Sequence, residues 1–257
     1  MHIPDGIVPA QVCAAGYALT GALTWHSLRK IKRYGDPSAS VPKASLLTAA
    51  FFVASSIYIP IPPSSVHLLL NGLLGVVLGY FAFPAILIGL FFQALIVGHG
   101  GLTTLGLNAT MMGAPALLAY HIFQLRRLKQ GAPSRFATGF FAFLGGAGGL
   151  AITALIFTGI VITTVPAEFN AQAERAAVTV LTVSHIPLAL LEGAFTAMLV
   201  LFLQRVKPDL LEGDLALRAA ADKAVAKAAD KAVAKAAAKA TAENDSLAAH
   251  QNRTVRR

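Results

Sequence analysis

Apolar residues dominate seven long stretches of the chain, and short polar segments separate them. These stretches cover residues 9–28, 43–59, 66–80, 81–97, 103–125, 136–164 and 176–206. Most approach the roughly 20 residues that a helix needs to cross the hydrocarbon core of a bilayer. In lipid a spanning segment must satisfy its own backbone hydrogen bonds, which favours helices over open strands. The pattern predicts an all-α integral membrane protein with about seven transmembrane helices. No charged residue separates the third stretch, which ends at residue 80, from the fourth, which begins at residue 81.

Basic residues lie on alternate connections between these stretches. They are Arg29, Lys30, Lys32, Arg33 and Lys43, then Arg126, Arg127, Lys129 and Arg135, and finally Arg205 and Lys207. Connections 60–65 and 98–102 carry no Lys or Arg, and connection 165–175 carries only Arg175. Because cytoplasmic loops are enriched in Lys and Arg, seven crossings predict an N-terminus outside and a C-terminus in the cytoplasm.

The composition supports a membrane protein. Hydrophobic residues make up 56% of the 257 residues and charged residues 13%, against roughly 25% charged in soluble domains. The net charge of +9 follows from the basic loops and tail, so we expect no nucleic-acid partner. The single cysteine, Cys13, excludes a disulfide framework or a thiolate metal cluster within one chain. Positive charge follows the first apolar stretch rather than preceding it, unlike in a signal peptide, so we expect the mature chain to begin at Met1.

Two low-complexity features complete the organisation. Alanines recur every four residues at Ala10, Ala14, Ala18 and Ala22, a spacing that suits close helix packing, either within this chain or against a partner membrane subunit. Residues 222–229 repeat directly as 230–237 in an Ala/Lys-rich segment that favours helix. We therefore predict a transmembrane domain at 1–206 and a cytoplasmic tail at 207–257.

The predicted topology sorts the seven histidines. His26, His121 and His250 fall on the inner side, whereas His2, His67 and His99 gather at the outer ends of the helices. His185 lies inside stretch 176–206, about 14 Å deep at 1.5 Å per residue. The outer group is a candidate cation site.

His2 has a specific chelating capacity. The Met1 amine, the His2 backbone nitrogen and the His2 Nδ1 can hold one metal through a five-membered and a six-membered ring, with the three nitrogens in a plane. His67 could supply a fourth nitrogen, giving a square-planar site typical of Ni(II) or Cu(II). The Pro4-Asp5-Gly6 turn could fold the first residues back onto the helix ends. The alternative is a solvated His2 with no role.

Several motifs resemble the CbiM/NikM family, the substrate-capture components of energy-coupling-factor (ECF) transporters for cobalt and nickel. They are Met1-His-Ile-Pro-Asp-Gly6, Pro60-Ile-Pro-Pro-Ser-Ser-Val-His67, Gly98-His-Gly-Gly-Leu-Thr-Thr-Leu-Gly-Leu-Asn108 and His185-Ile-Pro-Leu-Ala-Leu-Leu-Glu192. The resemblance covers about residues 1–206 and leaves out the tail. It implies that the N-terminal amine, the backbone nitrogen and imidazole of His2, and His67 hold the metal.

The resemblance also implies supporting roles around these ligands. The loop that contains His99 would line and close the site, which favours His99 as a neighbour of the ligands over His99 as a further ligand. We expect Thr103, Thr104 and Asn108 to bond the ligating imidazoles and fix their tautomers. His185 and Glu192 share one helix face and serve either as a polar contact between helices or in gating.

The resemblance implies an importer of Ni²⁺ or Co²⁺ in the plasma membrane, with cobalt uptake serving cobalamin biosynthesis. The chain has no Gly-x-x-x-x-Gly-Lys-Ser/Thr loop for ATP hydrolysis. The implied partners are a membrane scaffold subunit, cytoplasmic ATPases, a small accessory membrane subunit and the lipid bilayer.

Two alternatives remain. An intramembrane metalloenzyme would typically carry His-Glu-x-x-His, which is absent, so we expect no enzyme activity. A self-sufficient secondary transporter would usually show inverted repeats. The sequence leaves the choice between nickel and cobalt open.

Overall fold

The computed structural model describes residues 1–33, 37–57, 59–61, 64–128, 133–164, 171–211 and 229–230. The chain divides into two units, Met1–Gly213 and Asp214–Arg257. Apart from residues 207–211 and 229–230, the predicted Ala/Lys-rich tail lies outside the described residues. The domain boundary at 206/207 therefore stays a prediction.

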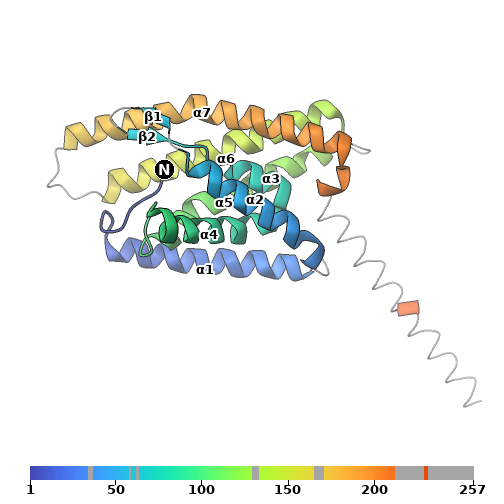
Figure 1. Cartoon of the computed structure of the whole chain (residues 1–257), viewed down its shortest axis with the longest axis horizontal. Coiled ribbons are helices and arrows are strands. Elements are labelled where there is room, and N and C mark those ends of the chain that lie inside the picture. The colour runs from blue at the N-terminus through green and yellow to red at the C-terminus, as the bar shows by residue number, and fades with distance from the viewer. Residues whose placement is uncertain are drawn as a thin grey trace, which may run out of the picture. The chain divides into compact units, whose positions relative to one another are not determined.

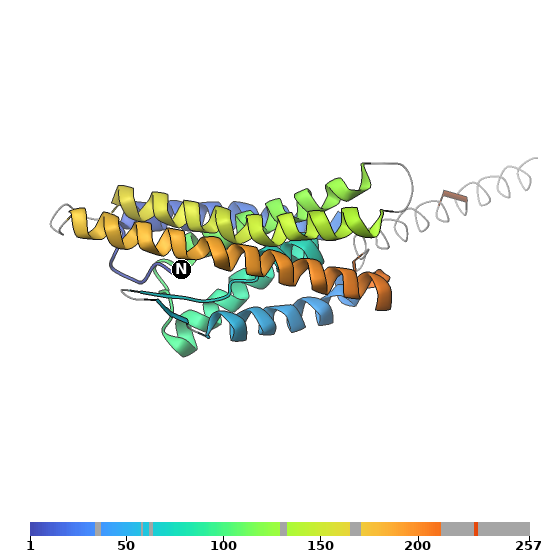
Figure 2. The same cartoon turned by 90° about the horizontal axis from the view of Figure 1, so that it is seen from above.

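Within its described residues the first unit contains seven α-helices (Figure 1). They are α1 Ala10–Arg33, α2 Val41–Ser55, α3 Asn71–Leu78, α4 Ala82–Phe92, α5 Leu105–Gln124, α6 Arg135–Thr164 and α7 Ala171–Val206. Each falls on a predicted apolar stretch, although α1 ends later and α7 begins earlier than predicted. The long helices α6 and α7 lie side by side (Figures 1 and 2).

The start of the third predicted helix is wrong. Strands β1, Ile59–Ile61, and β2, Ser64–Val66, form a short antiparallel hairpin, and residues 67–70 are non-helical before α3 begins at Asn71. The Glu192 carboxylate of α7 accepts hydrogen bonds from the backbone N–H groups of Leu69, at 2.5 Å, and Leu70, at 3.1 Å. Non-helical backbone is tolerated at membrane depth when the protein satisfies it in this way.

The chain reverses direction between α3 and α4. Gly79, with φ 59° and ψ −127°, ends α3, and one 3₁₀ turn leads into α4. Tyr80 at this reversal packs against the ring of His26, whereas Gln93 after α4 hydrogen-bonds to His2. We call the end of the unit that contains His2 the Met1 end, and the opposite end the Lys43 end, where Lys43 Nζ donates to the Val77 carbonyl. The predicted boundary at 80/81 coincides with this reversal.

Among the described residues, three helical stretches are long and apolar enough to cross a membrane. They are Asn71–Val97, Arg135–Thr164 and Val178–Val206, and the first includes the reversal at Gly79. Large apolar side chains point outward from several helices, among them Leu46, Ile96 and Phe136, which are 72%, 68% and 82% exposed. Such a surface suits lipid rather than water. The count of seven spans and the orientation stay predictions.

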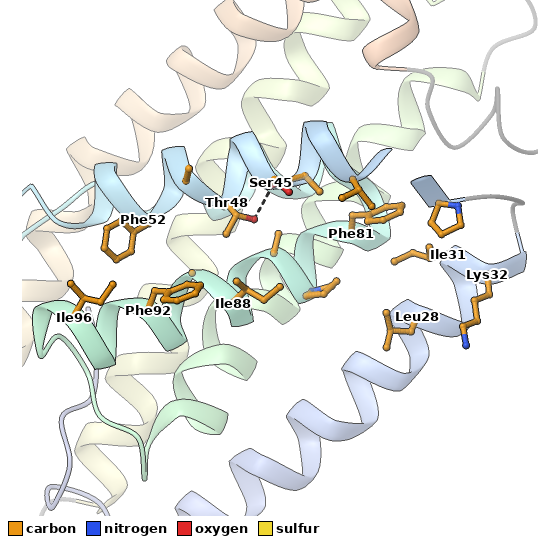
Figure 3. Close-up of a pocket in the computed structure, with 17 residues that line it drawn as sticks. Leu28, Ile31, Lys32, Ser45, Thr48, Phe52, Phe81, Ile88, Phe92 and Ile96 are labelled. Carbon is orange, nitrogen blue, oxygen red and sulfur yellow. Dashed lines mark hydrogen bonds between the residues drawn. The ribbon is translucent and has the colours of Figure 1, made fainter. Parts of the chain in front are cut away.

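Helices α2 and α4 lie side by side. A groove of about 670 Å³ separates parts of the two helices and reaches Lys32 at the Lys43 end (Figure 3). Phe52 of α2 faces Phe92 and Ile96 across this groove. The fully buried Phe51 of α2 packs against Gly89, which lines the groove. Gln93 donates a hydrogen bond to Ser55 near the end of α2.

Candidate metal centre

Asp5 fixes the N-terminal segment to the start of α5. Its carboxylate accepts the Thr103 hydroxyl at 2.5 Å and the backbone N–H groups of Leu102, Thr103 and Thr104 at 3.2, 3.0 and 3.3 Å. These bonds, the Thr103 hydroxyl first, lower the pKa of Asp5. A carboxylate just before a helix satisfies its free N–H groups and complements its dipole. A Cβ at Gly101 would overlap this carboxylate, so the contact requires glycine there.

The next contacts hold the backbone of Ile3. Its N–H donates to Asn108 Oδ1 at 2.9 Å, and its carbonyl accepts from Asn108 Nδ2 at 3.0 Å and from the Thr104 hydroxyl at 2.7 Å. Together with the turn at Gly6, whose φ is 84°, these bonds return the first residues to the helix ends as predicted. The expected role of Thr103, Thr104 and Asn108 is wrong, because they bond to the N-terminal segment rather than to imidazoles.

The returned segment brings three histidines together at the Met1 end. One nitrogen each from His2, His67 and His99 lies within 4.8 Å of the others. The His2 ring centroid is 5.0 Å from that of His67 and 4.0 Å from that of His99. The Met1 amine nitrogen lies 2.7 Å from His67 Nε2. His67 comes from the non-helical stretch before α3 rather than from the helix itself, which corrects its predicted position.

Burial prepares these nitrogens to act as ligands. The Met1 residue is only 6% exposed, and burial lowers the pKa of its amine from 8.0 to about 5. Burial and then the charge of that amine lower the pKa of His2 well below its usual value, and the same two causes lower the pKa of His99 to about 4. At neutral pH these groups therefore carry lone pairs instead of the protons that would compete with a metal ion.

Gln93 is a site residue that the sequence interpretation missed. His2 Nε2 lies 2.9 Å from Gln93 Oε1, while His2 Nδ1 is buried without a hydrogen-bond partner among the described residues. Gln93 itself is fully buried. A single amide in the apolar stretch 81–97 was the available signal, because polar groups at membrane depth generally have a partner.

His185 and Glu192 lie near the cluster but do not join it. Glu192 accepts hydrogen bonds from the backbone of Leu69 and Leu70, in the non-helical stretch after His67. His185 Nδ1 lies 2.6 Å from the Leu181 carbonyl of its own helix. Its ring does not belong to the group formed by His2, His67 and His99. Neither residue shows geometry that establishes gating.

Comparison with known proteins identifies the family. Residues 2–210 match the family CbiM, described as "Cobalt uptake substrate-specific transmembrane region". The chain belongs to this family. A "Putative metal transport protein" of Haemophilus influenzae is 33% identical over 215 residues, covering 82% of this chain and 97% of the relative. A "Putative fused nickel transport protein NikMN" of Archaeoglobus fulgidus is 30% identical over 229 residues, covering 86% of this chain and 73% of the relative.

A solved structure shares the fold. The "Crystal Structure of an transition metal transporter" aligns with a TM-score of 0.65 at 23% identity, over 80% of this chain and 93% of that one. These relatives are transport proteins, so this member of the CbiM family is a transport component rather than an enzyme. That finding confirms the predicted family.

Proposed function

We propose that this CbiM-family protein captures Ni²⁺ or Co²⁺ at the Met1 end and delivers it to an ATP-driven importer of the ECF type. The proposed ligands are the Met1 amine, the His2 backbone nitrogen, His2 Nδ1 and His67 Nε2. The family's description as a cobalt-uptake region and the relative described as a nickel transport protein support this choice of substrates.

The observation that carries this proposal is the 2.7 Å between the Met1 amine and His67 Nε2. With metal–nitrogen bonds of about 2.0 Å, adjacent corners of a square lie about 2.8 Å apart. The two nitrogens are thus spaced as neighbouring ligands of one ion. The His2 backbone nitrogen and His2 Nδ1 would occupy the two remaining corners, and four nitrogens in a plane favour Ni(II) over Co(II). His99 packs on His2 beside this plane.

Orientation and assembly extend the same proposal. The Met1 end would face outward and the basic loops inward in the plasma membrane. The alanines at positions 10, 14, 18 and 22 are exposed on α1, which supports a docking face for a membrane scaffold subunit. Cytoplasmic ATPases and a small accessory membrane subunit would complete the transporter, and imported cobalt would serve cobalamin biosynthesis.

The test is isothermal titration of purified protein with Ni²⁺ and with Co²⁺. We compare the native N-terminus with a variant that carries one additional residue before Met1, which converts the amine into an amide. The control carries the same residue after Arg257. Tight binding by the native protein and the control, with affinity lost in the N-terminal variant, is the expected result. Equal binding by all three would contradict the Met1–His2 chelate, and a secondary transporter without this chelate would become the better account.

A further inference from the structure

Hydrogen bonds connect His2 to α2 through a chain of three groups. The Ser55 hydroxyl lies 2.5 Å from the Phe51 carbonyl of its own helix, and the Gln93 amide also bonds to Ser55. The other end of the same amide lies 2.9 Å from His2 Nε2. Ser55 and Gln93 are both fully buried, so water does not compete for these bonds.

Each member of the chain determines the direction of the next hydrogen bond. A serine hydroxyl has one proton, and Ser55 donates it to the Phe51 carbonyl, a common choice for serine within a helix. Ser55 can therefore only accept from Gln93, which turns the Gln93 amino group toward Ser55 and its oxygen toward His2. That oxygen can only accept, so His2 carries its proton on Nε2 and its lone pair on Nδ1.

The opposite direction of these hydrogen bonds is unfavourable. If Ser55 donated to Gln93, the amide would present its amino group to His2 Nε2, and the His2 proton would move to Nδ1. Nδ1 is buried and has no acceptor within the described part of the chain, so this arrangement would leave a buried N–H unsatisfied. The forward direction instead leaves a buried lone pair, which is what a metal ligand requires.

We propose that Gln93 and Ser55 are positioning residues that fix the tautomer of His2 and present its Nδ1 to the metal ion. This inference rests on the proposed function, because it assigns the mechanism by which one proposed ligand is prepared.

The backbone of Gln93 gives the same residue a second connection to the cluster. Gln93–Val97 form a single π-helical turn, a feature that often marks functional sites. The Gln93 carbonyl accepts the backbone N–H of His99 at 3.1 Å. The side chain thus orients His2 while the main chain holds the start of the His99 loop, so Gln93 links two of the three clustered histidines.

The test uses ¹⁵N-histidine-labelled, full-length protein in lipid nanodiscs. The tautomer of His2 is measured by NMR without metal, and Ni²⁺ affinity is measured by titration. Gln93→Leu removes the acceptor, whereas Gln93→Glu retains an acceptor for His2 Nε2. The matched control is Ser56→Ala, because the neighbouring Ser56 hydroxyl bonds to the Phe52 carbonyl of its own helix, at 2.7 Å, and not to Gln93.

We expect His2 in the native protein and in Gln93→Glu to be protonated on Nε2. Gln93→Leu should lose this preference and bind Ni²⁺ about 10- to 100-fold more weakly, as for other partners of metal-ligating histidines. Ser55→Ala should weaken Ni²⁺ binding less than Gln93→Leu does. Its effect should vanish in the Gln93→Leu background, because Ser55 acts on His2 only through its hydrogen bond with Gln93. Ser56→Ala should leave both measurements unchanged.

Two results would overturn the inference: His2 protonated on Nδ1 in the native protein, or an unchanged tautomer in Gln93→Leu. If Gln93→Leu does not fold, the tautomers of the native protein and Ser55→Ala decide the matter. Failure of the native protein to bind Ni²⁺ would instead reject the proposed function, because the tautomer is measured without metal.

Discussion

The two ends of the helical unit each contain histidines, but in different surroundings. At the Met1 end, His2, His67 and His99 each place one nitrogen within 4.8 Å of the other two. The Met1 amine lies 2.7 Å from His67 Nε2. At the Lys43 end, His26 and His121 pack against the ring of Tyr80, with centroid distances of 5.8 and 5.9 Å. Lys30 lies over the same tyrosine ring, at 5.8 Å.

The difference shows what separates the candidate metal site from a set of histidines. At the Met1 end the buried Met1 amine lies 2.7 Å from His67 Nε2, beside the rings of His2 and His99, and hydrogen bonds that involve Asp5 and Asn108 hold the N-terminal segment that carries Met1 and His2. At the Lys43 end the imidazoles contact aromatic rings and lie among Lys and Arg side chains, whose charge repels a cation. Substitutions at the two ends should therefore differ in their effect on metal binding.

The largest expected effect comes from removing a proposed ligand at the Met1 end. His67→Ala should weaken Ni²⁺ binding by more than the roughly 10- to 100-fold caused by losing a partner of a ligand. His121→Ala at the Lys43 end is the matched control and should leave the affinity within about twofold. Both affinities come from titration, and equal losses in the two variants would remove the distinction between the ends.

Asp5→Ala should have the next largest effect. The variant retains every proposed ligand but loses the bonds to residues 102–104 that hold the N-terminal segment in place. We expect Ni²⁺ affinity to fall by about 10-fold or more, in the range for groups that orient ligands. Asp209→Ala, at an exposed site near the Lys43 end, is the control. An unchanged affinity in Asp5→Ala would show that the segment docks by other means.

The pH dependence of binding near neutrality should correspond to the loss of a single proton. Because the pKa of the Met1 amine is lowered from 8.0 to about 5, the amine is already neutral above pH 6 and releases no proton when metal binds. Only the His2 backbone amide should then lose a proton, and affinity should rise about 10-fold per pH unit between pH 6 and 8. Below about pH 5, where the amine is protonated, the dependence should steepen. Titration in buffers of different ionisation enthalpy counts the protons released, and two or more at pH 7 would contradict the neutral amine.

The smallest expected effect concerns the support beneath His67. Glu192→Gln retains one side-chain oxygen for the Leu69 and Leu70 N–H groups but weakens the bonds made by a carboxylate. A loss of about 1 kcal/mol in stability would lower the unfolding temperature by roughly 2–4 °C. Thermal unfolding measures this change, with Ser184→Ala as the control on the same helix. A larger loss of Ni²⁺ affinity than in Asp5→Ala would instead indicate a direct role for Glu192 in handling the ion.

The sequence predicts much of this arrangement because its signals are local or chemical. Apolar length locates the helices, and Pro4-Asp5-Gly6 predicts the turn. The chelating geometry of Met1 and His2 singles out the N-terminus before any fold is known. His67 follows from the need for a fourth nitrogen at the same end.

The remainder depends on contacts between distant segments. The apolar character of residues 66–80 does not reveal that residues 67–70 are non-helical, because Glu192 on α7 provides the compensating bonds. The bonds from residues 103, 104 and 108 to Asp5 and Ile3 cannot be predicted either, because they depend on how the N-terminal segment docks. Ser55 and Gln93 lie on different elements, and only the packing of α2 on α4 joins them.

X-ray absorption spectroscopy of the Ni²⁺-loaded native protein tests the proposed metal centre most directly, because it reports the ligands and their geometry together. We expect four nitrogen ligands in a square plane and the loss of that signature when one residue is added before Met1. A six-coordinate ion with oxygen ligands, or a spectrum that the added residue leaves unchanged, would contradict the proposed site.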